Sequence, residues 1–438
     1  MWHSSIMVVV TLLAIFAVAS ASLPASLPPD NAKPAPTGVV DLSLPPAQRW
    51  EAVFREAIAR HGFEHSFGPL LDQIRLWLQY HAADAEVILP VITAATKARF
   101  PTYYEEITGM ISTFQSLGHN VTMDTMIAWN WMAMVKHFNL SSSSKSAAAA
   151  AAPELPGGAR GGRACTSLIA RNEDGTILHA RNDDADAAKT TRNLTVDVDF
   201  VDGAGGVVAK ATAFLGWAGV YTALTPGVAS LTEDQRLSAP LHRDTYLALI
   251  RDHPAMGPTH LITRQAMVDY GGGTGGGGPV ATPRTFSGIA RYLEAADYLL
   301  PEYLILAGTA DGVVLAHNYT AMMGMHTLRL GQTTPYVPLD WALVQTNYDF
   351  WEPLPYAKAD PRRQVLVAAF EKGGRGATAT VGGLLGALSI ESPNKKADGA
   401  GPNGVLNVGT VFSVIMVPSN STLRSYLRNS DGCCGGGP

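Results

Sequence analysis

Cys165 is the residue of this chain with the clearest potential for chemistry. The 438 residues contain three cysteines, and the other two, Cys433 and Cys434, are adjacent in a glycine-rich tail. Cys165 stands at the start of a β-rich region, directly after the low-complexity stretch 141–163. If the bond between Ala164 and Cys165 is cut, the thiol and a free α-amine share one residue, and such an amine titrates near neutrality and can take the thiol proton. The sequence therefore predicts a cysteine nucleophile that needs no histidine, with a small buried core cysteine as the alternative.

Metal and phosphate chemistry find little support in the sequence. None of the 12 histidines stands in a metal-ligand spacing such as HExxH, and no CxxC pair precedes the tail. The glycine run 271–278 lacks the GK[ST] continuation of a phosphate-binding loop and is typical of a spacer. We therefore expect no metal and no cofactor.

Two regions of different periodicity must position the nucleophile. Helical spacing predicts a first region of helices without intervening strands, at 48–61, 70–80, 103–117 and 123–138. Short strands are predicted at 166–170, 176–180, 207–215, 303–307, 313–317, 342–346 and 410–417, with helices at 240–252, 286–299 and 364–372. Residues 23–46 are rich in proline and alanine and are expected to be extended. The second region thus favours an α+β domain of antiparallel sheets covered by helices.

The N-terminus and the sequons indicate the secretory pathway. An apolar run ends in small residues at Ala21, which predicts a signal peptide over 1–21, with a retained anchor as the alternative. Five glycosylation sequons follow, at Asn120, Asn139, Asn193, Asn318 and Asn420. The net charge is -5 and no stripe of basic residues is present, so we expect no nucleic acid partner.

Several separated segments carry a family resemblance. Cys-Thr-Ser-Leu-Ile-Ala from Cys165, then Gly175 and His-Ala-Arg-Asn-Asp-Asp ending at Asp184, resemble the acid ceramidase and N-acylethanolamine acid amidase family. Further similar segments are Leu44-Pro-Pro46, Arg49-Trp50, Glu105-Glu106 with Gly109, residues 216–222, Val344-Gln-Thr-Asn-Tyr-Asp349, Trp351, Asp360 and Arg362-Arg363. The resemblance covers most of residues 38–428.

The resemblance implies a precursor that cleaves itself between Ala164 and Cys165. The products would be an N-terminal helical chain, residues 22–164, and a catalytic chain, residues 165–438, with the four-layer αββα fold of N-terminal-nucleophile hydrolases. The implied catalytic residues are Cys165, Arg181, Asp184, Asn347 and Arg362. Asp184 would orient the α-amine, Arg181 would favour the thiolate or steady the substrate carbonyl, and Asn347 would help to form the oxyanion hole. Tyr221 would contribute only its backbone near that hole.

Each of these residues also has a structural interpretation. Arg181 and Asp184 could form a surface ion pair, Asn347 could cap a turn, and Arg362 with Arg363 could be solvated charges at a helix start. The apolar clusters in 70–77 and 129–132 are expected to be helix core, with a lipid-binding face as the alternative.

Two departures from the family pattern affect maturation. Gln235 stands where relatives usually have Glu, which could alter autocleavage or its pH. No cysteine precedes Cys165, so the disulfide that joins the two chains of ceramidase relatives is not available, and the chains must hold together by packing.

The expected activity is hydrolysis of the amide bond of an N-acyl lipid, with ceramide first and an N-acylethanolamine second. The alternatives are a bile-salt or penicillin-V type acylase and a non-catalytic lipid-binding glycoprotein. The expected partners are the lipid amide substrate, the two chains of a heterodimer, and a membrane surface or lipid-activator protein. The expected location is lysosomal or extracellular.

Overall fold

The computed structural model describes residues 32–131, 165–185, 188–236, 241–253, 255–269, 284–319, 324–352, 360–391 and 404–428. Several predicted features lie outside these residues. They are the signal peptide 1–21, the linker 141–163 with Ala164, Asn139, the glycine run 271–278, and Cys433 with Cys434. Within the described residues, none of the helices has the length and hydropathy needed to cross a bilayer.

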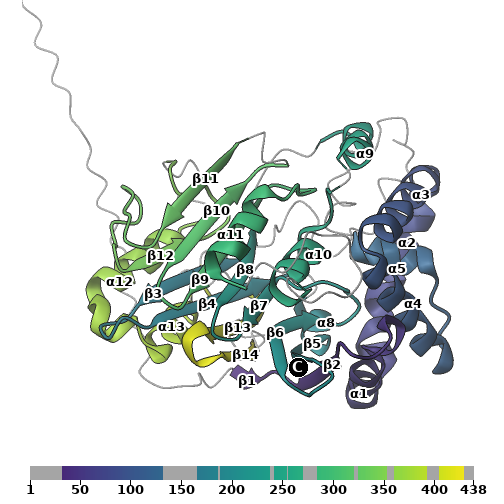
Figure 1. Ribbon diagram of the computed structural model, residues 1–438, viewed down its shortest axis with the longest axis horizontal. Coiled ribbons are helices and arrows are strands. Elements are labelled where there is room, and N and C mark those ends of the chain that lie inside the picture. Colours follow the sequence, from purple (N-terminus) through teal and green to yellow (C-terminus); the bar gives the residue numbers. More distant parts are fainter. Residues whose placement is uncertain are drawn as a thin grey trace, which may run out of the picture.

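Two sheets form the centre of the structure (Figure 1). The first has six strands in the order β1 (Ala32–Pro34), β14 (Thr422–Arg428), β13 (Thr410–Val417), β4 (Ile177–Asp184), β3 (Thr166–Arg171) and β12 (Ala342–Gln345). The second has eight, in the order β11 (Met325–Arg329), β10 (Gly312–His317), β9 (Glu302–Gly308), β8 (Ala229–Gln235), β7 (Thr222–Thr225), β6 (Val207–Phe214), β5 (Thr195–Val201) and β2 (Thr37–Asp41). All neighbouring strands are antiparallel except β2 and β5.

The hairpin that follows Cys165 forms as its turn residues predict. Asn172 N donates to Thr176 O over 2.9 Å, and Gly175 has a φ of 92°, a conformation that glycine adopts without steric cost. The register pairs Thr166 with Asn182 and Ser167 with Arg181. Because side chains alternate along a strand, Cys165, Ser167 and Arg181 share the face of the first sheet that is turned toward the second.

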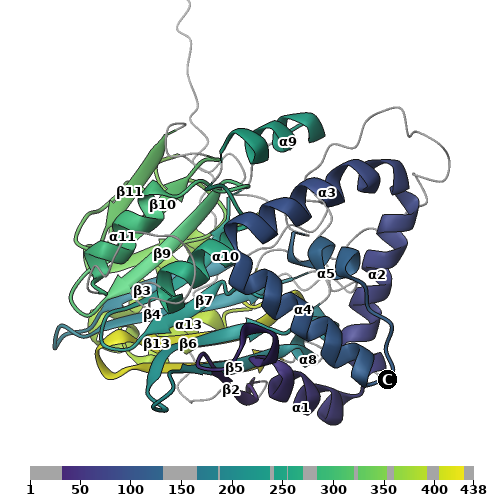
Figure 2. The same ribbon diagram turned by 45° about the vertical axis from the view of Figure 1, so that its right-hand side comes forward.

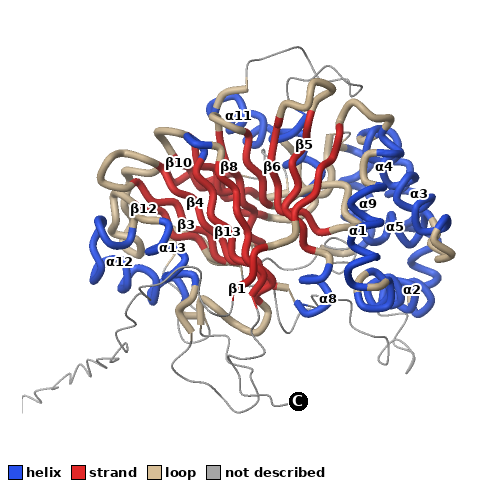
Figure 3. Tube along the Cα trace, turned by 90° about the horizontal axis from the view of Figure 1, so that it is seen from below, coloured by secondary structure: helices blue, strands red, loops and turns tan. Residues whose placement is uncertain are grey.

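Helices cover the outer faces of both sheets, which gives four layers (Figure 3). On the first sheet, Leu168 and Ala180 pack against Phe370 of α12 (Arg362–Thr378) and Leu384 of α13 (Val381–Leu388). Between the sheets, Ile169 packs with Ile305 and Val314. Helices α9 (Arg243–Asp252), α10 (Thr259–Arg264) and α11 (Phe286–Ala295) lie on the side of the second sheet, and α8 (Ala188–Asn193) precedes β5. The predicted αββα architecture is confirmed.

The N-terminal region is helical, as predicted, and packs beside the second sheet (Figure 2). Its helices are α1 (Glu51–His61), α2 (Phe67–Tyr80), α3 (Ala82–Arg99), α4 (Pro101–Ser116) and α5 (Met123–Asn130). The sequence-based prediction missed α3, because Pro90 lies inside it and its apolar positions are spread around the helix. The clusters around Leu71, Ile74 and Trp129 are buried, which confirms helix core, while Leu76 is 43% exposed.

Residues 32–41 are extended, as expected for the proline-rich segment, and they also pair with both sheets. Strand β1 pairs with β14 at the edge of the first sheet, and β2 pairs with β5 at the edge of the second. The segment therefore closes one edge of each sheet, where unpaired backbone groups would otherwise be exposed. Residues 32–41 show no alternation of apolar and polar residues that would predict this pairing, because an edge strand needs backbone partners more than a buried side-chain face.

Candidate active site

Cys165 lies buried between the two sheets, directly before β3, with 1% of its surface exposed. Its Sγ accepts a hydrogen bond of 3.2 Å from Arg181 Nη2. Burial raises the pKa of the thiol, the guanidinium of Arg181 lowers it, and the carboxylates of Asp183 and Asp234 raise it further. The thiol is therefore held protonated, next to a cation that can stabilise a thiolate.

Arg181 lies among the carboxylates of three other residues. Its guanidinium lies 2.9 Å from Asp183 Oδ2, 3.7 Å from Asp234 Oδ1 and 3.9 Å from Glu233 Oε2. Burial disfavours its charge, but Asp183 and the other carboxylates hold its pKa above the usual value. Arg181 is 1% exposed, so the alternative of a surface ion pair with Asp184 is wrong in both location and partner.

Asp184 belongs to the opposite face of β4. Its Oδ2 accepts a hydrogen bond of 2.8 Å from Asn407 Nδ2, whereas Oδ1 is buried without a hydrogen-bond partner. Burial raises the pKa of this carboxyl to about 6, and the charge of Arg362 lowers it in part. Because Thr166 pairs with Asn182, Cys165 aligns with Asp183 and Asp184 stands one position beyond it.

Arg362 connects Cys165 to Asn347. It begins α12, and Asp360 orients it through a 2.7 Å bond from Nε to Oδ1. Nη1 donates to the Cys165 carbonyl oxygen over 2.8 Å and to Thr166 Oγ1 over 3.0 Å, and Nη2 donates to Asn347 Oδ1 over 2.9 Å. Arg362 and Arg363 are each 1% exposed, so the alternative of solvated helix-start charges is wrong.

Asn347 follows β12 and is fixed on both sides of its amide. Oδ1 accepts from Arg362, and Nδ2 donates to Gln235 O over 2.7 Å. Within the part of the chain that the structure describes, the side chain bonds to these two residues and caps no turn, so the alternative of a turn cap is wrong. The structure thus brings Cys165, Arg181, Asn347 and Arg362 into one hydrogen-bonded group, which Asp184 adjoins through the charge of Arg362.

The sequence-based prediction missed the acidic residues around Arg181. Asp183 could have been found, since it is two residues from Arg181 and a strand places such residues on one face. Glu233 and Asp234 come from β8 of the other sheet, and no local signal connects them to residue 181. Asp234 Oδ1 also accepts from Ser167 Oγ over 2.9 Å. A buried polar network thus extends from Cys165 into the space between the sheets.

Two other residues singled out from the sequence lie beside the group. Tyr221 is buried against Trp217 and His260, and its backbone oxygen lies 3.4 Å from Arg181 Nη1. Gln235 contributes its backbone oxygen to Asn347. Among the described residues, no group of three His, Cys, Asp or Glu side chains is arranged to hold a metal ion.

The sequons occupy different environments. Asn120 and Asn420 are exposed. Asn193 and Asn318 are half-buried, and each makes a 2.7 Å side-chain hydrogen bond, Asn193 Nδ2 to His65 O and Asn318 Oδ1 from Arg236. Glycosylation at all of these positions stays a prediction.

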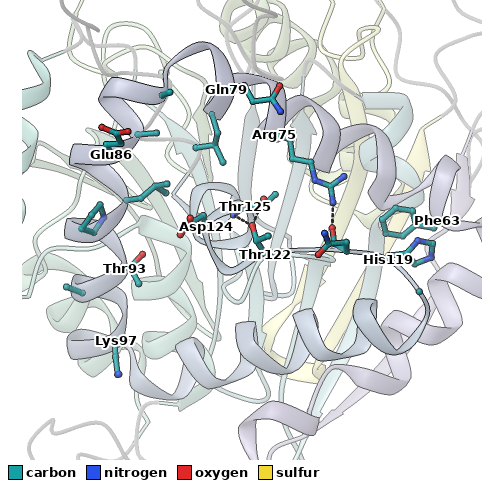
Figure 4. Close-up of a pocket in the computed structure, with 18 residues that line it drawn as sticks. Phe63, Arg75, Gln79, Glu86, Thr93, Lys97, His119, Thr122, Asp124 and Thr125 are labelled. Atoms are coloured by element: carbon teal, nitrogen blue, oxygen red, sulfur yellow. Dashed lines mark hydrogen bonds between the residues drawn. The ribbon is translucent and has the colours of Figure 1, made fainter.

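A pocket of about 1080 Å³ lies in the helical region, between α2, α3 and α5 (Figure 4). Apolar residues such as Leu78 and Leu89 line it, together with Arg75, Glu86 and Lys97. None of the five predicted site residues lines this pocket. The pocket therefore lies apart from Cys165.

The buried carboxyls contribute stability that is lost as the pH rises, and buried His179 acts in the opposite direction, because burial lowers its pKa to about 3. Burial raises the pKa of Asp234 from 3.8 to about 7 and that of Asp184 to about 6. Because the folded state then binds more protons than the unfolded state, the stabilisation is complete below about pH 4 and is lost as the pH passes 7. We expect Asp234 by itself to contribute a fall of about 2 kcal/mol in the free energy of unfolding between pH 5 and pH 7.5.

Denaturant unfolding of a Cys165→Ala chain at these two pH values measures the change without interference from cleavage. Comparison with the same chain carrying Asp234→Asn isolates the contribution of Asp234 from those of Asp184 and His179. A difference in the free energy of unfolding between the two chains that is the same at pH 5 and at pH 7.5 would contradict the assignment.

Comparison with known proteins finds two groups of relatives. The chain is 28% identical over 218 residues to the N-acylethanolamine-hydrolyzing acid amidase of Rattus norvegicus, covering 48% of this chain and 52% of the relative. It is 26% identical over 277 residues to the amidase of that name from Caenorhabditis elegans, covering 61% and 65%. It is 27% identical over 294 residues to the acid ceramidase of Heterocephalus glaber, covering 62% and 64%. The chain thus spans between about half and two thirds of the length of these curated relatives.

Among solved structures, the Caenorhabditis elegans amidase ortholog is 26% identical with a TM-score of 0.44, covering 58% of this chain and 93% of that chain. A bile acid hydrolase mutant from Clostridium perfringens is 8% identical with a TM-score of 0.31, covering 63% and 95%. No protein-family model matches the chain.

Proposed function

Since the chain is related in sequence to the acid ceramidase and N-acylethanolamine acid amidase family, we propose that it hydrolyses the amide bond of N-acyl lipids with Cys165 as nucleophile. One observation carries the proposal: the guanidinium of Arg362 joins the Cys165 backbone to the Asn347 amide, while Arg181 donates to the thiol. Nucleophile, charge and amide donor are the parts that acyl transfer requires.

Maturation by cleavage between Ala164 and Cys165 would complete this group. The cut frees the α-amine of Cys165, which titrates near neutrality and can accept the thiol proton. Asp184 is the residue we assign to hold this amine, because its Oδ1 is buried without a hydrogen-bond partner and lies on the strand paired with β3. A new ammonium would also offset the excess of buried carboxylates around Arg181.

The reaction then proceeds as acyl transfer in two steps. The thiolate attacks the amide carbonyl, and Nδ2 of Asn347 donates to the oxyanion that forms. The α-amine passes its proton to the leaving amine, which departs as the carbon–nitrogen bond breaks. Water then cleaves the thioester and releases the fatty acid. The chemistry uses the side chains and the α-amine alone, without a metal or an organic cofactor.

We propose that both chains persist as a heterodimer, residues 22–164 with residues 165–438. Strands β1 and β2 of the N-terminal chain hydrogen-bond to β14 and β5 of the catalytic chain. Asn130 adds a second contact, because its Nδ2 donates to Gly216 O over 3.0 Å and its Oδ1 accepts from Ala218 N over 2.8 Å. These contacts bury backbone groups that separation would expose, so no disulfide is needed.

Ceramide is the substrate we propose first, and an N-acylethanolamine second. Relatives of both names match this chain at 25–28% identity, which favours testing both lipids in parallel. The apolar N-terminal run and the sequons support entry into the secretory pathway and residence in a lysosome or outside the cell. We also propose that the lipid reaches the protein from a membrane surface or through an activator protein.

The test combines N-terminal sequencing with lipid hydrolysis. The secreted protein is incubated at pH 4.5 and pH 7.5 with ceramide and with an N-acylethanolamine, and released fatty acid is quantified. We expect a new N-terminus at Cys165 and fatty acid release from at least one lipid. A protein that binds these lipids but stays uncut and releases nothing would instead support the lipid-binding glycoprotein.

A further inference from the structure

The loop that carries Asn347 is tied to the end of β8 at two points. The first is the 2.7 Å hydrogen bond from Asn347 Nδ2 to Gln235 O. The second is an ion pair between the residues that follow, in which Arg236 Nε and Nη2 donate to Asp349 Oδ1 and Oδ2 over 2.7 and 2.8 Å. A planar guanidinium and a carboxylate in this two-bonded arrangement fix both distance and orientation.

The ion pair is itself held in place. The hydroxyl of Tyr303 donates to Asp349 Oδ1 over 2.6 Å, and Arg236 Nη1 donates to Asn318 Oδ1 over 2.7 Å. The side chains of Arg236 and Asp349 are 16% and 15% exposed, so the pair is largely removed from water. Such a pair is far less screened than a surface pair and can hold two backbone segments together.

The two ties leave one donor of Asn347 available. An amide nitrogen carries two hydrogens, and one of them is used on Gln235 O. Arg362 occupies Oδ1, which prevents the amide from turning over. The second Nδ2 hydrogen has no acceptor among the described residues. Its direction is therefore set by how firmly residues 235 and 347 are kept together.

We propose that Arg236 and Asp349 form a positioning clamp that directs the Asn347 amide toward the carbonyl oxygen of the substrate bound at Cys165. The inference rests on the proposed function and adds two residues that act through Asn347 without touching the substrate. It also gives position 235 a role: its backbone oxygen receives the amide, so Gln can serve there in place of Glu.

Asp349→Asn tests the clamp, because it keeps the size of the side chain and removes the charge. A donor displaced by about 1 Å can cost up to about 10²-fold in rate. We therefore expect kcat for the lipid amide to fall about 10- to 100-fold with KM within about twofold. Arg236→Lys, which cannot form two parallel bonds, should have a similar effect. Asp199→Asn, which removes a partly exposed pair with Lys210 at 2.9 Å, is the matched control and should leave kcat unchanged.

A double-mutant cycle separates positioning from a general loss of structure. If the clamp acts only through Asn347, Asp349→Asn should lower kcat no further in an Asn347→Ala background. Full additivity of the two changes, or an Asp349→Asn enzyme with unchanged kcat, would overturn the inference.

Crystal structures of the wild type and of Asp349→Asn test the position without any need for turnover. We expect the bond between Asn347 Nδ2 and Gln235 O to lengthen or break in the variant, and an unmoved amide would overturn the clamp. If the wild type hydrolyses no lipid amide, the proposed function is refuted. The comparison of the two crystal structures would still show whether Arg236 and Asp349 position the Asn347 amide.

Discussion

A chain in which Cys165 is replaced by alanine is expected to stay in one piece and to release no fatty acid from N-acyl lipids. The alanine has no thiol to attack either the preceding peptide bond or the lipid carbonyl. Loss of a nucleophile costs about 10⁴-fold or more in kcat, so activity should fall below detection. Electrophoresis and intact mass measure the cleavage, and fatty acid release measures the hydrolysis.

A second variant assigns the activity to this thiol. The double change Cys433→Ala and Cys434→Ala leaves Cys165 as the sole cysteine. This variant should be cut and active, and alkylation by iodoacetamide after cleavage should then abolish its activity. A Cys165→Ala chain that is still cut at residue 165, or that still hydrolyses the lipid, would refute the N-terminal nucleophile.

Glu106→Gln is expected to destabilise the chain by about 3 kcal/mol or more, because a buried charge cluster would lose its central anion. Glu106 is 1% exposed and accepts hydrogen bonds from Arg49 over 3.1 Å and from Trp50 Nε1 over 2.7 Å. Across the boundary between the two proposed chains, Arg264 Nη2 donates to its Oε1 over 2.8 Å. Removing the carboxylate leaves two buried guanidinium groups without their shared partner.

The same cluster should keep the two chains together after cleavage. Arg264 lies over the ring of Tyr103, 4.6 Å from its centre, so charge and aromatic contacts meet at one place in the interface. Nearby, Gly109 lets α4 approach Ala47 closely, since an added Cβ would lie 1.8 Å from the Ala47 carbonyl oxygen. We therefore expect the cleaved Glu106→Gln protein to lose its N-terminal chain more readily than the wild type.

Urea unfolding in the Cys165→Ala background measures the stability of the uncut chain, and co-purification after cleavage measures the association. Glu105→Gln is the matched control, because Glu105 is the exposed neighbour on the same helix and should change stability by less than about 0.5 kcal/mol. Equal effects of the two substitutions would show that the buried cluster does not hold the interface.

The sequence predicted the parts of this protein that depend on local pattern. Helical spacing located most N-terminal helices, and the turn at residues 172–175 predicted the hairpin of β3 and β4. The candidate site residues came from motifs that resemble those of a known family, and the structure places four of them in one hydrogen-bonded group. The helices and the hairpin could be predicted because side-chain periodicity and turn chemistry act over a few residues.

Only the tertiary structure decided what surrounds these residues. Glu233 and Asp234 reach Arg181 because two sheets pack face to face, and Arg236 reaches Asp349 because β8 ends beside the loop after β12. Strands β1 and β2 likewise form because their backbones pair with the edges of the two sheets. Contacts of this kind join residues that are far apart in the chain, and their energies come from burial and charge that exist only after folding. The sequence by itself therefore determined the candidate nucleophile and its neighbours in the hairpin, and the packing of the two sheets determined their electrostatic environment.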